Sequence, residues 1–173
     1  MTVDRATEQA VAVRPARPDD AEAIAAIYGE GIAGRGATFV TTVPAAENVR
    51  AWLRQRGPFL VAERDGRVVG WAAVTDYSDV PAYRGVGEFA LYVAAAARGG
   101  GVGRTLLSAL CEAAERDARF KLIGKIFPEN RASLAVARAC GFEEVGTHRR
   151  HGRLDGRWRD VTVVERLLGE ARG

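Results

Sequence analysis

Apolar residues in the first part of the chain recur at helical spacing. Ile24 and Tyr28 fall on one face of a helix that begins at Pro18 and has acidic residues in its first turn. We expect four closely spaced glycines to break this helix: Gly29, Gly31, Gly34 and Gly36. A loop at 37–39 follows, and Pro44 begins a second helix.

Two pairs of strand-like runs are each separated by an Asp-Gly pair. The first two runs are 59–63 and 68–75, and the last two are 143–151 and 158–167. Asp-Gly between apolar runs is a strong hairpin signal, so the sequence predicts two antiparallel hairpins. Residues 12–16 add a short first strand.

The middle of the chain alternates between strand and helix around a glycine-rich loop. An apolar strand at 89–93 precedes the loop, and a helix with leucines at helical spacing follows it. Another strand at 120–127 leads into a helix that is capped by Asn130 and runs to Cys140. The element order β-α-α-β-β-β-α-β-α-β-β predicts an α/β fold with one mixed sheet of about seven strands and helices on both faces.

Length and charge narrow the class of protein. A chain of 173 residues can form one domain with a full core, which we expect over 12–170 after a flexible tail at 1–11. The net charge is only +3, and the basic segment 148–153 is more typical of a solvated face or an anion site than of a nucleic-acid surface. We expect Cys111 and Cys140 to be reduced cysteines in the core of a cytoplasmic protein. We expect no metal, no nucleic acid and no membrane partner.

The glycine-rich loop from Arg98 to Arg104 carries the clearest chemical signal. Backbone N–H groups of such a loop and of the helix after it favour an anion such as phosphate, although a flexible connection is the simpler interpretation. A P-loop is excluded because Arg98 and Arg104 stand where that motif needs Gly and Lys. The dinucleotide-binding fingerprint is excluded because Arg104 or Leu106 occupies its last small position.

The pattern that fits is Arg98-x-x-Gly101-x-Gly103, which resembles the Arg/Gln-x-x-Gly-x-Gly/Ala motif of the GCN5-related N-acetyltransferase (GNAT) superfamily. The element order also resembles that fold, and the resemblance covers nearly the whole chain. It is closest to the phosphinothricin and arsinothricin N-acetyltransferase group. The further motifs that carry it are Ile27-Tyr28 with Thr38-Phe39, Tyr83-x-Gly85-Val86-Gly87-Glu88, Asn130 with Ser133 and Gly141-Phe142, and His151-Gly152-Arg153 with Asp155-Gly156 and Trp158-Arg159-Asp160-Val161.

The resemblance implies a binding site for acetyl-CoA. In this fold the central strand splays from its parallel neighbour, here 121–127, and its open edge pairs with the pantetheine amides. A backbone N–H near Leu91 would then polarise the thioester carbonyl. The resemblance assigns these residues to acetyl-CoA: Leu91, Tyr92, Val93, Arg98, Gly99, Gly100, Gly101, Val102, Gly103, Arg104, Asn130 and Ser133. For Asn130, a plain helix cap is an equally good interpretation.

Glu88 is the candidate catalytic residue. An α-amine is mostly protonated at neutral pH, so a carboxylate must take its proton directly or through a water molecule. The resemblance places Glu88 at the acceptor end of the acyl tunnel, whereas the simpler interpretation is a charged strand end facing water. Ala137 stands where many members carry a Tyr or His that protonates the leaving thiolate. The thiolate would therefore leave unaided, take a proton from water or use another group.

The resemblance also implies an acceptor pocket with cationic and phenolic donors, since arginine and similar groups suit phosphinate and arsinate anions. The candidates are Phe39, Tyr77, Tyr83, Arg84, His151 and Arg153. Each of them is equally compatible with an ordinary surface position. Val80 stands in a loop where related chains carry Arg, which leaves the binding of an anionic substrate open.

These observations favour an enzyme that moves acetyl from acetyl-CoA to the α-amine of a small amino-acid-like toxin. Methionine sulfoximine, methionine sulfone, a polyamine and a peptide N-terminus are alternative acceptors, and a non-catalytic acyl-CoA-binding module is the alternative of a different class. The resemblance implies a homodimer with the last strands at or near its interface.

Overall fold

The computed structural model describes residues 10–55 and 57–169. The expected flexible tail at 1–11 lies outside these residues except for residues 10 and 11, and residue 170 of the expected domain also lies outside them. Within the described part, the element order predicted from the sequence is confirmed.

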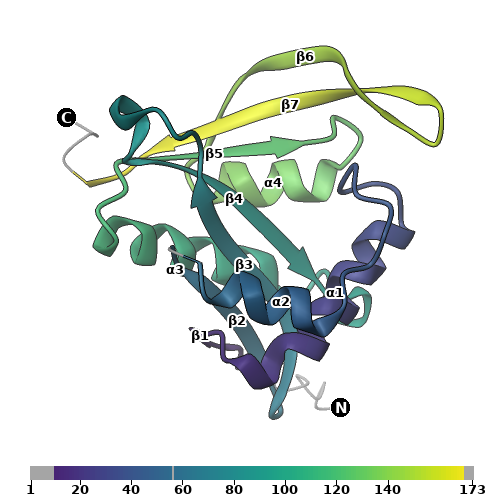
Figure 1. Ribbon diagram of the computed structural model, residues 1–173, viewed down its shortest axis with the longest axis vertical. Coiled ribbons are helices and arrows are strands. Elements are labelled where there is room, and N and C mark those ends of the chain that lie inside the picture. The colour runs from purple at the N-terminus through teal and green to yellow at the C-terminus, as the bar shows by residue number, and fades with distance from the viewer. Residues whose placement is uncertain (1–9, 56, 170–173) are drawn as a thin grey trace, which may run out of the picture.

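One sheet of seven strands runs through the molecule in the order β1-β2-β3-β4-β5-β7-β6 (Figure 1). The strands are β1 (Ala12–Pro15), β2 (Phe59–Arg64), β3 (Arg67–Asp76), β4 (Val86–Val93), β5 (Lys121–Ile126), β6 (Glu143–Leu154) and β7 (Arg157–Leu167). The helices are α1 (Ala21–Ala33), α2 (Ala46–Leu53), α3 (Val102–Arg116) and α4 (Arg131–Ala139). Neighbouring strands are antiparallel except β4 and β5, so the sheet is mixed as expected.

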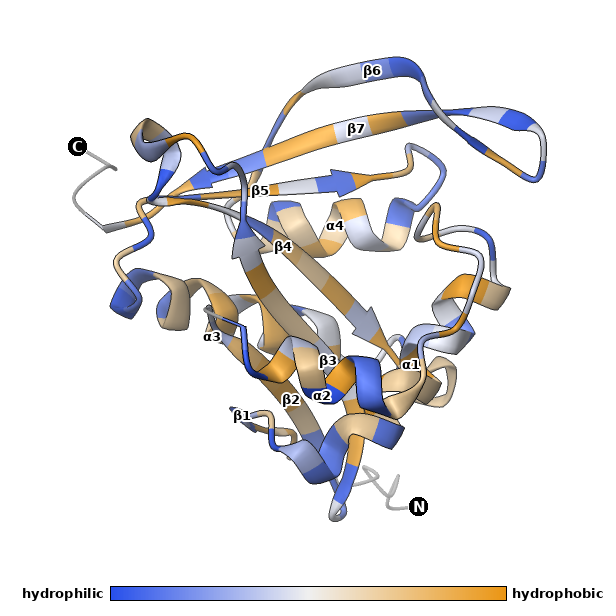
Figure 2. Cartoon of the chain, in the orientation of Figure 1, coloured by the Kyte–Doolittle hydropathy of each residue, from blue (hydrophilic) through white to orange (hydrophobic). Residues whose placement is uncertain are grey.

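Helices cover both faces of the sheet because its strands alternate apolar side chains between two cores. In β3, Trp71 and Ala73 pack against α1 and α2, whereas Ala72 and Val74 pack on the side of α3. Figure 2 shows the hydrophobic colouring concentrated on β2, β3 and β4, between the helical layers. The buried sheet and its two helical layers thus form a rigid frame for the loops at the ends of the strands.

The parallel pair β4 and β5 separates partway along its length. The two strands are paired only from Val86 to Glu88 on β4 and from Lys121 to Ile123 on β5. Both strands continue beyond that point, and Figure 1 shows them starting side by side and then diverging. The predicted splay of the central strands is therefore confirmed, and it leaves one edge of β4 without a strand partner.

The structure corrects the prediction that glycines break the first helix. Helix α1 continues through Gly29 and Gly31 and ends at Ala33, so these two glycines do not break it. A Cβ atom at Gly31 would lie 2.8 Å from the ring of Tyr92, so glycine at this position allows the helix to approach β4 closely. Packing against the sheet compensates for the low helix propensity of glycine. The helix also begins later than predicted, because Pro18–Asp20 form a 3₁₀ turn.

Both predicted hairpins form, with the expected backbone in their turns. Asp65 and Gly66 have φ values of 51° and 73°, and Asp155 and Gly156 have φ values of 49° and 76°. Two consecutive left-handed residues are characteristic of the tight type I′ hairpin turn. The second hairpin is longer than predicted, because β6 reaches Leu154 and β7 begins at Arg157.

Asp20, at the start of the first helix, forms a buried link to β1, and this link predicts a pH dependence of stability. Its carboxylate accepts hydrogen bonds from the Arg14 side chain at 2.8 and 2.9 Å, and these bonds hold the pKa of Asp20 below its ordinary value. A lowered native pKa stabilises the fold above the unfolded value of about 3.9, and this contribution is lost as pH falls through the native pKa.

We therefore expect Asp20→Asn to lower the free energy of unfolding at pH 7 by about 1–3 kcal/mol, because the half-buried Arg14 guanidinium loses one of its two carboxylate partners and keeps only Glu63. Urea denaturation at a series of pH values measures this difference, which should shrink below about pH 4. A difference that stays constant down to pH 2 would contradict the ion pair as its source.

Candidate active site

The glycine-rich loop opens helix α3 and presents unpaired backbone donors. Gly99 and Gly101 have φ values of 78° and 76°, in the left-handed region that favours glycine, and Gly101 is the N-cap of α3. No side chain caps this helix, so the N–H groups of its first turn, Val102 to Arg104, have no partner within the helix. A Cβ atom at Gly99 or Gly101 would meet nothing within 4 Å, so the loop faces open space. The arrangement is that of a phosphate-binding helix N-terminus.

A cavity of about 580 Å³ lies between this loop, the free edge of β4, the start of α4 and the end of α1. Eleven of the twelve residues that the sequence assigned to the cosubstrate line it: Leu91, Tyr92, Val93, Arg98, Gly99, Gly101, Val102, Gly103, Arg104, Asn130 and Ser133. Gly100 is not among them and lies instead beside the guanidinium of Arg64. The cavity also contains Glu30, which the sequence analysis missed and whose carboxylate accepts a hydrogen bond from the Ala95 N–H at 2.6 Å.

The free edge of β4 presents the peptide groups of alternate residues to this cavity. The Ala94 N–H donates to the Val69 carbonyl on the β3 side. Peptide groups in a strand alternate in direction, so those of Leu91 and Val93 face the opposite, unpaired edge. In agreement, the Val93 carbonyl accepts a hydrogen bond from Arg98 Nε at 3.1 Å. The N–H of Leu91 is therefore directed towards the gap between β4 and β5, as the sequence analysis expected.

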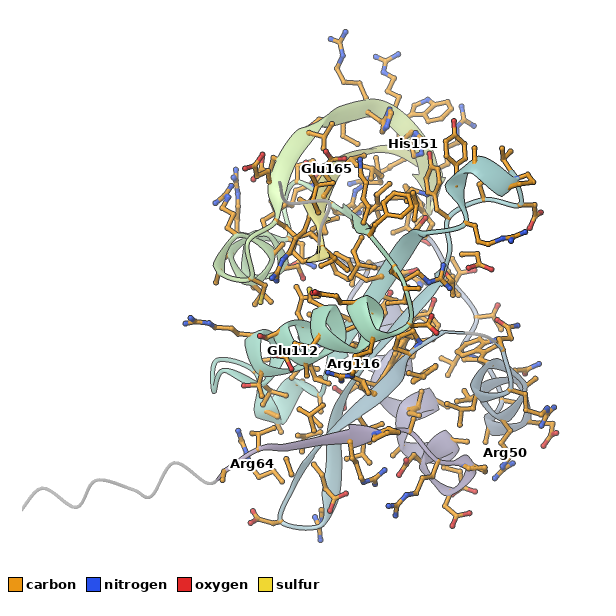
Figure 3. The ribbon with its side chains drawn as sticks, turned by 90° about the vertical axis from the view of Figure 1, so that its left-hand side faces the viewer. Arg50, Arg64, Glu112, Arg116, His151 and Glu165 are labelled. Atoms are coloured by element: carbon orange, nitrogen blue, oxygen red, sulfur yellow. The ribbon has the colours of Figure 1, made fainter. Side chains whose placement is uncertain are left out.

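A second cavity of about 370 Å³ continues from the first towards the β6–β7 hairpin. The two cavities share Ala37, Leu91, Tyr92, Asn130 and Ser133, so they meet at the free edge of β4. Three residues that the sequence analysis assigned to the reaction or to the acceptor line the second cavity: Phe39, Glu88 and His151. Figure 3 shows His151 on the hairpin strands, at the upper end of the molecule in that view.

Glu88 is paired with a residue that the sequence analysis missed. Its Oε2 atom lies 2.9 Å from Nζ of Lys125 on β5, and both side chains line the second cavity. The side chains are 31% and 43% exposed, so a small molecule in the cavity can reach both. Glu88 and Ile123 are paired across β4 and β5, and Lys125 follows Ile123 by two residues on the same face of the strand. The sequence analysis missed Lys125 because finding it requires the register between β4 and β5, and hydrophobic periodicity does not give that register.

The loop between α1 and α2 forms one wall of both cavities. The ring of Phe39 packs against that of Phe127 with a centroid separation of 4.9 Å, and a Cβ atom at Gly152 would lie 2.7 Å from the Phe39 ring. Asn130 Nδ2 donates to the Gly36 carbonyl at 3.2 Å, and Arg159 donates to the Arg35 carbonyl at 3.2 Å. These contacts hold the loop against α4 and the hairpin, so Phe39 is a fixed apolar wall.

The polar side chains at the junction of the two cavities are Tyr92, Asn130 and Ser133. Burial raises the pKa of the Tyr92 phenol above its ordinary value, so this phenol stays protonated at neutral pH and is a weak acid. Asn130 accepts a hydrogen bond from the Ser133 N–H at 3.1 Å, which confirms the predicted cap of α4. Ala137 is buried and supplies no proton.

Four of the predicted acceptor residues lie outside both cavities. Tyr77 and Tyr83 contact each other on the exposed loop between β3 and β4, with ring centroids 5.8 Å apart. Arg84 follows them on that loop, and the guanidinium of Arg153 lies 4.4 Å from the centre of the Trp158 ring. Val80 is 49% exposed on the same loop and also lies outside the cavities.

The described part of the chain contains no group of three or more His, Cys, Asp or Glu side chains that could hold a metal ion. None of its helices is both long enough and apolar enough to cross a membrane.

Comparison with known proteins places this geometry in a family. A sequence profile of the Acetyltransferase (GNAT) family matches residues 32–142. The phosphinothricin N-acetyltransferase of Alcaligenes faecalis is 39% identical over 164 residues, which cover 92% of this chain and 83% of that protein.

Solved structures agree with the sequence relatives. The ribosomal-protein-alanine N-acetyltransferase from Brucella melitensis superposes with a TM-score of 0.87 at 39% identity, covering 91% of this chain and 99% of that one. The phosphinothricin acetyltransferase from Sinorhizobium meliloti, solved in complex with acetyl-CoA, has a TM-score of 0.87 at 31% identity, covering 92% of this chain and 89% of that one.

The two contacts of Asn130 can be separated by substitution. Asn130→Ala removes the cap of α4 and the bond to Gly36, and should lower the free energy of unfolding by about 1–2 kcal/mol. Asn130→Asp keeps an oxygen for the Ser133 N–H and loses only the donor to Gly36, so it should cost less than Asn130→Ala. Urea denaturation of both variants measures these losses. Equal destabilisation by Ala and Asp would contradict the capping role.

Proposed function

The chain belongs to the acetyltransferase (GNAT) family and is an N-acetyltransferase, and on that premise we propose that it moves acetyl from acetyl-CoA to the α-amine of a small free amino acid. Phosphinothricin, arsinothricin and similar amino-acid toxins are the proposed acceptors, and their detoxification is the proposed physiological role. Methionine sulfoximine and methionine sulfone belong to the same chemical class.

The meeting of two cavities at the free edge of β4 carries this proposal. The first cavity fits acetyl-CoA, because its glycine loop offers N–H groups to a pyrophosphate and the β4 edge offers peptide groups to the pantetheine amides. Arg98 and Arg104 add positive charge beside the loop. The thioester would then lie at the junction, where the Leu91 N–H can polarise its carbonyl. The second cavity supplies a carboxylate and room for an acceptor.

In the proposed reaction Glu88 removes a proton from the α-ammonium of the acceptor, directly or through a water molecule. The freed amine attacks the thioester carbonyl carbon, so an N–C bond forms while the C–S bond breaks, and the acylated nitrogen releases its extra proton to water to leave a neutral amide. The electron pair of the C–S bond goes to sulfur. Both substrates are bound at once, because the two cavities adjoin at Leu91 and Tyr92.

The departing thiolate needs no side-chain acid in this proposal. The three polar side chains at the junction have no acidic group that ionises near neutral pH, and the raised pKa of Tyr92 makes it a poor donor. A thiol with a pKa of about 8.5 is a good enough leaving group to depart as the anion and take a proton from water.

Two rivals predict different measurements. The similarity to the ribosomal-protein-alanine acetyltransferase favours a peptide N-terminus as acceptor. Phe39, as a fixed wall of the second cavity, instead favours a smaller acceptor. A non-catalytic acyl-CoA-binding module would bind acetyl-CoA in the first cavity without using Glu88. We also propose that the protein is cytoplasmic, a compartment that would suit its cosubstrate and its two buried cysteines.

Thiol release from acetyl-CoA tests the acceptor class. The panel contains phosphinothricin, arsinothricin, methionine sulfoximine, methionine sulfone, glutamate, spermidine and an N-terminal peptide. We expect rapid turnover with one or more of the first four and little with spermidine or the peptide. Turnover confined to the peptide or to spermidine would reject the proposed acceptor class. No turnover at all, with acetyl-CoA still bound, would favour the binding module.

The same assay with Glu88→Gln tests the base. Turnover should fall by roughly two to four decades while the affinity for acetyl-CoA is retained, because the carboxylate lies in the second cavity. Glu144→Gln is a matched control, since Glu144 is also paired with a cation, Arg138, but lies outside both cavities. Equal activity of Glu88→Gln and the control would remove Glu88 from the mechanism.

We also propose that the protein is a two-fold homodimer through its terminal hairpin. Strand β6 is the edge of the sheet and is exposed along most of its length, with Val145 60% and Trp158 50% exposed on the hairpin. Such an edge is suited to association with a second copy. The mass in solution should be about twice the 18.6 kDa of one chain, and Trp158→Glu should reduce it. A wild-type monomer across the micromolar range would remove the dimer proposal.

A further inference from the structure

The second cavity contains a cation and an anion in direct contact, Lys125 from β5 and Glu88 from β4. Lys125 lines the cavity from strand β5 and not from one of the surrounding loops. Beyond Ile123 the strand β5 has separated from β4, so the Lys125 side chain spans the gap and brings Nζ to 2.9 Å from the Glu88 carboxylate. The α1–α2 loop and the hairpin flank the pair with Phe39 and His151 on the other walls of the cavity, and the pair stays open to solvent on one side.

A free α-amino acid matches this pair of charges. It carries an ammonium group and a carboxylate on one carbon, so a complementary site must place an anion and a cation side by side. Building on the proposed function, we propose that Lys125 binds the α-carboxylate of the acceptor while Glu88 receives its α-amine. Lys125 keeps its proton throughout and takes no part in the transfer of the acetyl group.

This arrangement selects among the classes of acceptor. A polyamine brings no carboxylate, and its second cation would be repelled by Lys125. A peptide N-terminus has a neutral carbonyl where the free amino acid has a carboxylate, so the charge on Lys125 would have no partner other than Glu88. Lys125 therefore favours free amino acids over both rivals by a charge-assisted contact.

The other cations near the predicted pocket do not compete for this role. Arg84 and Arg153 lie outside the second cavity, and the exposed Val80 brings no charge to it. Of the lysine and arginine side chains in the described part of the chain, Lys125 is the one that lines this cavity. Binding of the acceptor carboxylate to Lys125 would also release Glu88 from its ion pair, so that its carboxylate can face the amine.

The test uses two acceptors that differ only in the group that Lys125 is proposed to bind. The first is the panel amino acid that the wild-type enzyme acetylates fastest, and the second is its α-carboxamide. Wild-type enzyme should prefer the acid by at least about tenfold in kcat/KM, which corresponds to about 1.4 kcal/mol. In Lys125→Met the KM for the acid should rise by about 10- to 100-fold with kcat within about threefold, because a contact made equally in the ground and transition states is lost. The KM of the carboxamide should change by less than about threefold, because it brings no carboxylate to Lys125, so most of the preference for the acid disappears.

A second variant and a matched control keep the result interpretable. Lys125→Arg keeps the positive charge and should restore most of the preference. Lys121→Met is the matched control. Lys121 is also a lysine of β5 and is paired with Glu165 on the hairpin (Figure 3), but it lies outside both cavities. The Lys121→Met enzyme should therefore behave like the wild type. Acetyl-CoA affinity measured by calorimetry should be the same in all of these proteins, which shows that each is folded.

Two results would overturn the proposal. If Lys125→Met lowers kcat equally for the acid and the carboxamide at unchanged KM, Lys125 only orients Glu88. If the wild-type enzyme uses the acid and the carboxamide equally, no carboxylate subsite exists. Failure of the proposed function is detected first, in the panel assay. If the wild-type enzyme releases no thiol with any amino acid of the panel, both the proposed function and the carboxylate subsite are rejected.

Discussion

The separation of β4 from β5 is the constraint on which the rest of the site depends. Pairing ends at Glu88 and Ile123, and the ring of Phe89 fills the base of the fork on the side of α3 and α4. The ring lies so close to Gly124 that a Cβ atom there would be 2.4 Å away, and it also packs against Phe142 at 5.0 Å. Glycine at 124 is therefore needed for this packing. A continuous sheet at this point would leave no room for either cavity.

Separation of the strands has a cost, which the flanking layers offset. The free edge of β4 has peptide groups without strand partners, and buried peptide groups are costly when unpaired. One of them, the Val93 carbonyl, is satisfied by Arg98. The cores on both sides of the sheet remain intact, with Leu106 and Leu110 on one side and Ile24 and Val49 on the other fully buried. The fold can therefore keep an open, polar edge at its centre for a ligand.

Much of the fold could be predicted from the sequence, because its signals are local. Apolar periodicity and the Asp-Gly turns predicted the order of the elements, and the spacing of Arg98, Gly101 and Gly103 indicated the anion loop. The predictions were wrong where a distant contact decides the outcome. Gly29 and Gly31 remain inside α1 because the Tyr92 ring lies against Gly31, and no local pattern reveals that ring. Tertiary packing overrides propensity at such positions.

The acceptor side of the site was harder to predict for the same reason. Tyr77, Tyr83 and Arg84 share one loop, and the sequence cannot tell whether such a loop folds over a cavity or away from it. Lys125 was missed because its contact with Glu88 depends on the register between two strands that are more than thirty residues apart in the chain. Once those strands diverge, side chains from both face a common space, and a charge on one is balanced by a charge on the other. A residue placed just beyond the fork can therefore change which acceptor binds without disturbing the sheet, the glycine loop or the cosubstrate cavity.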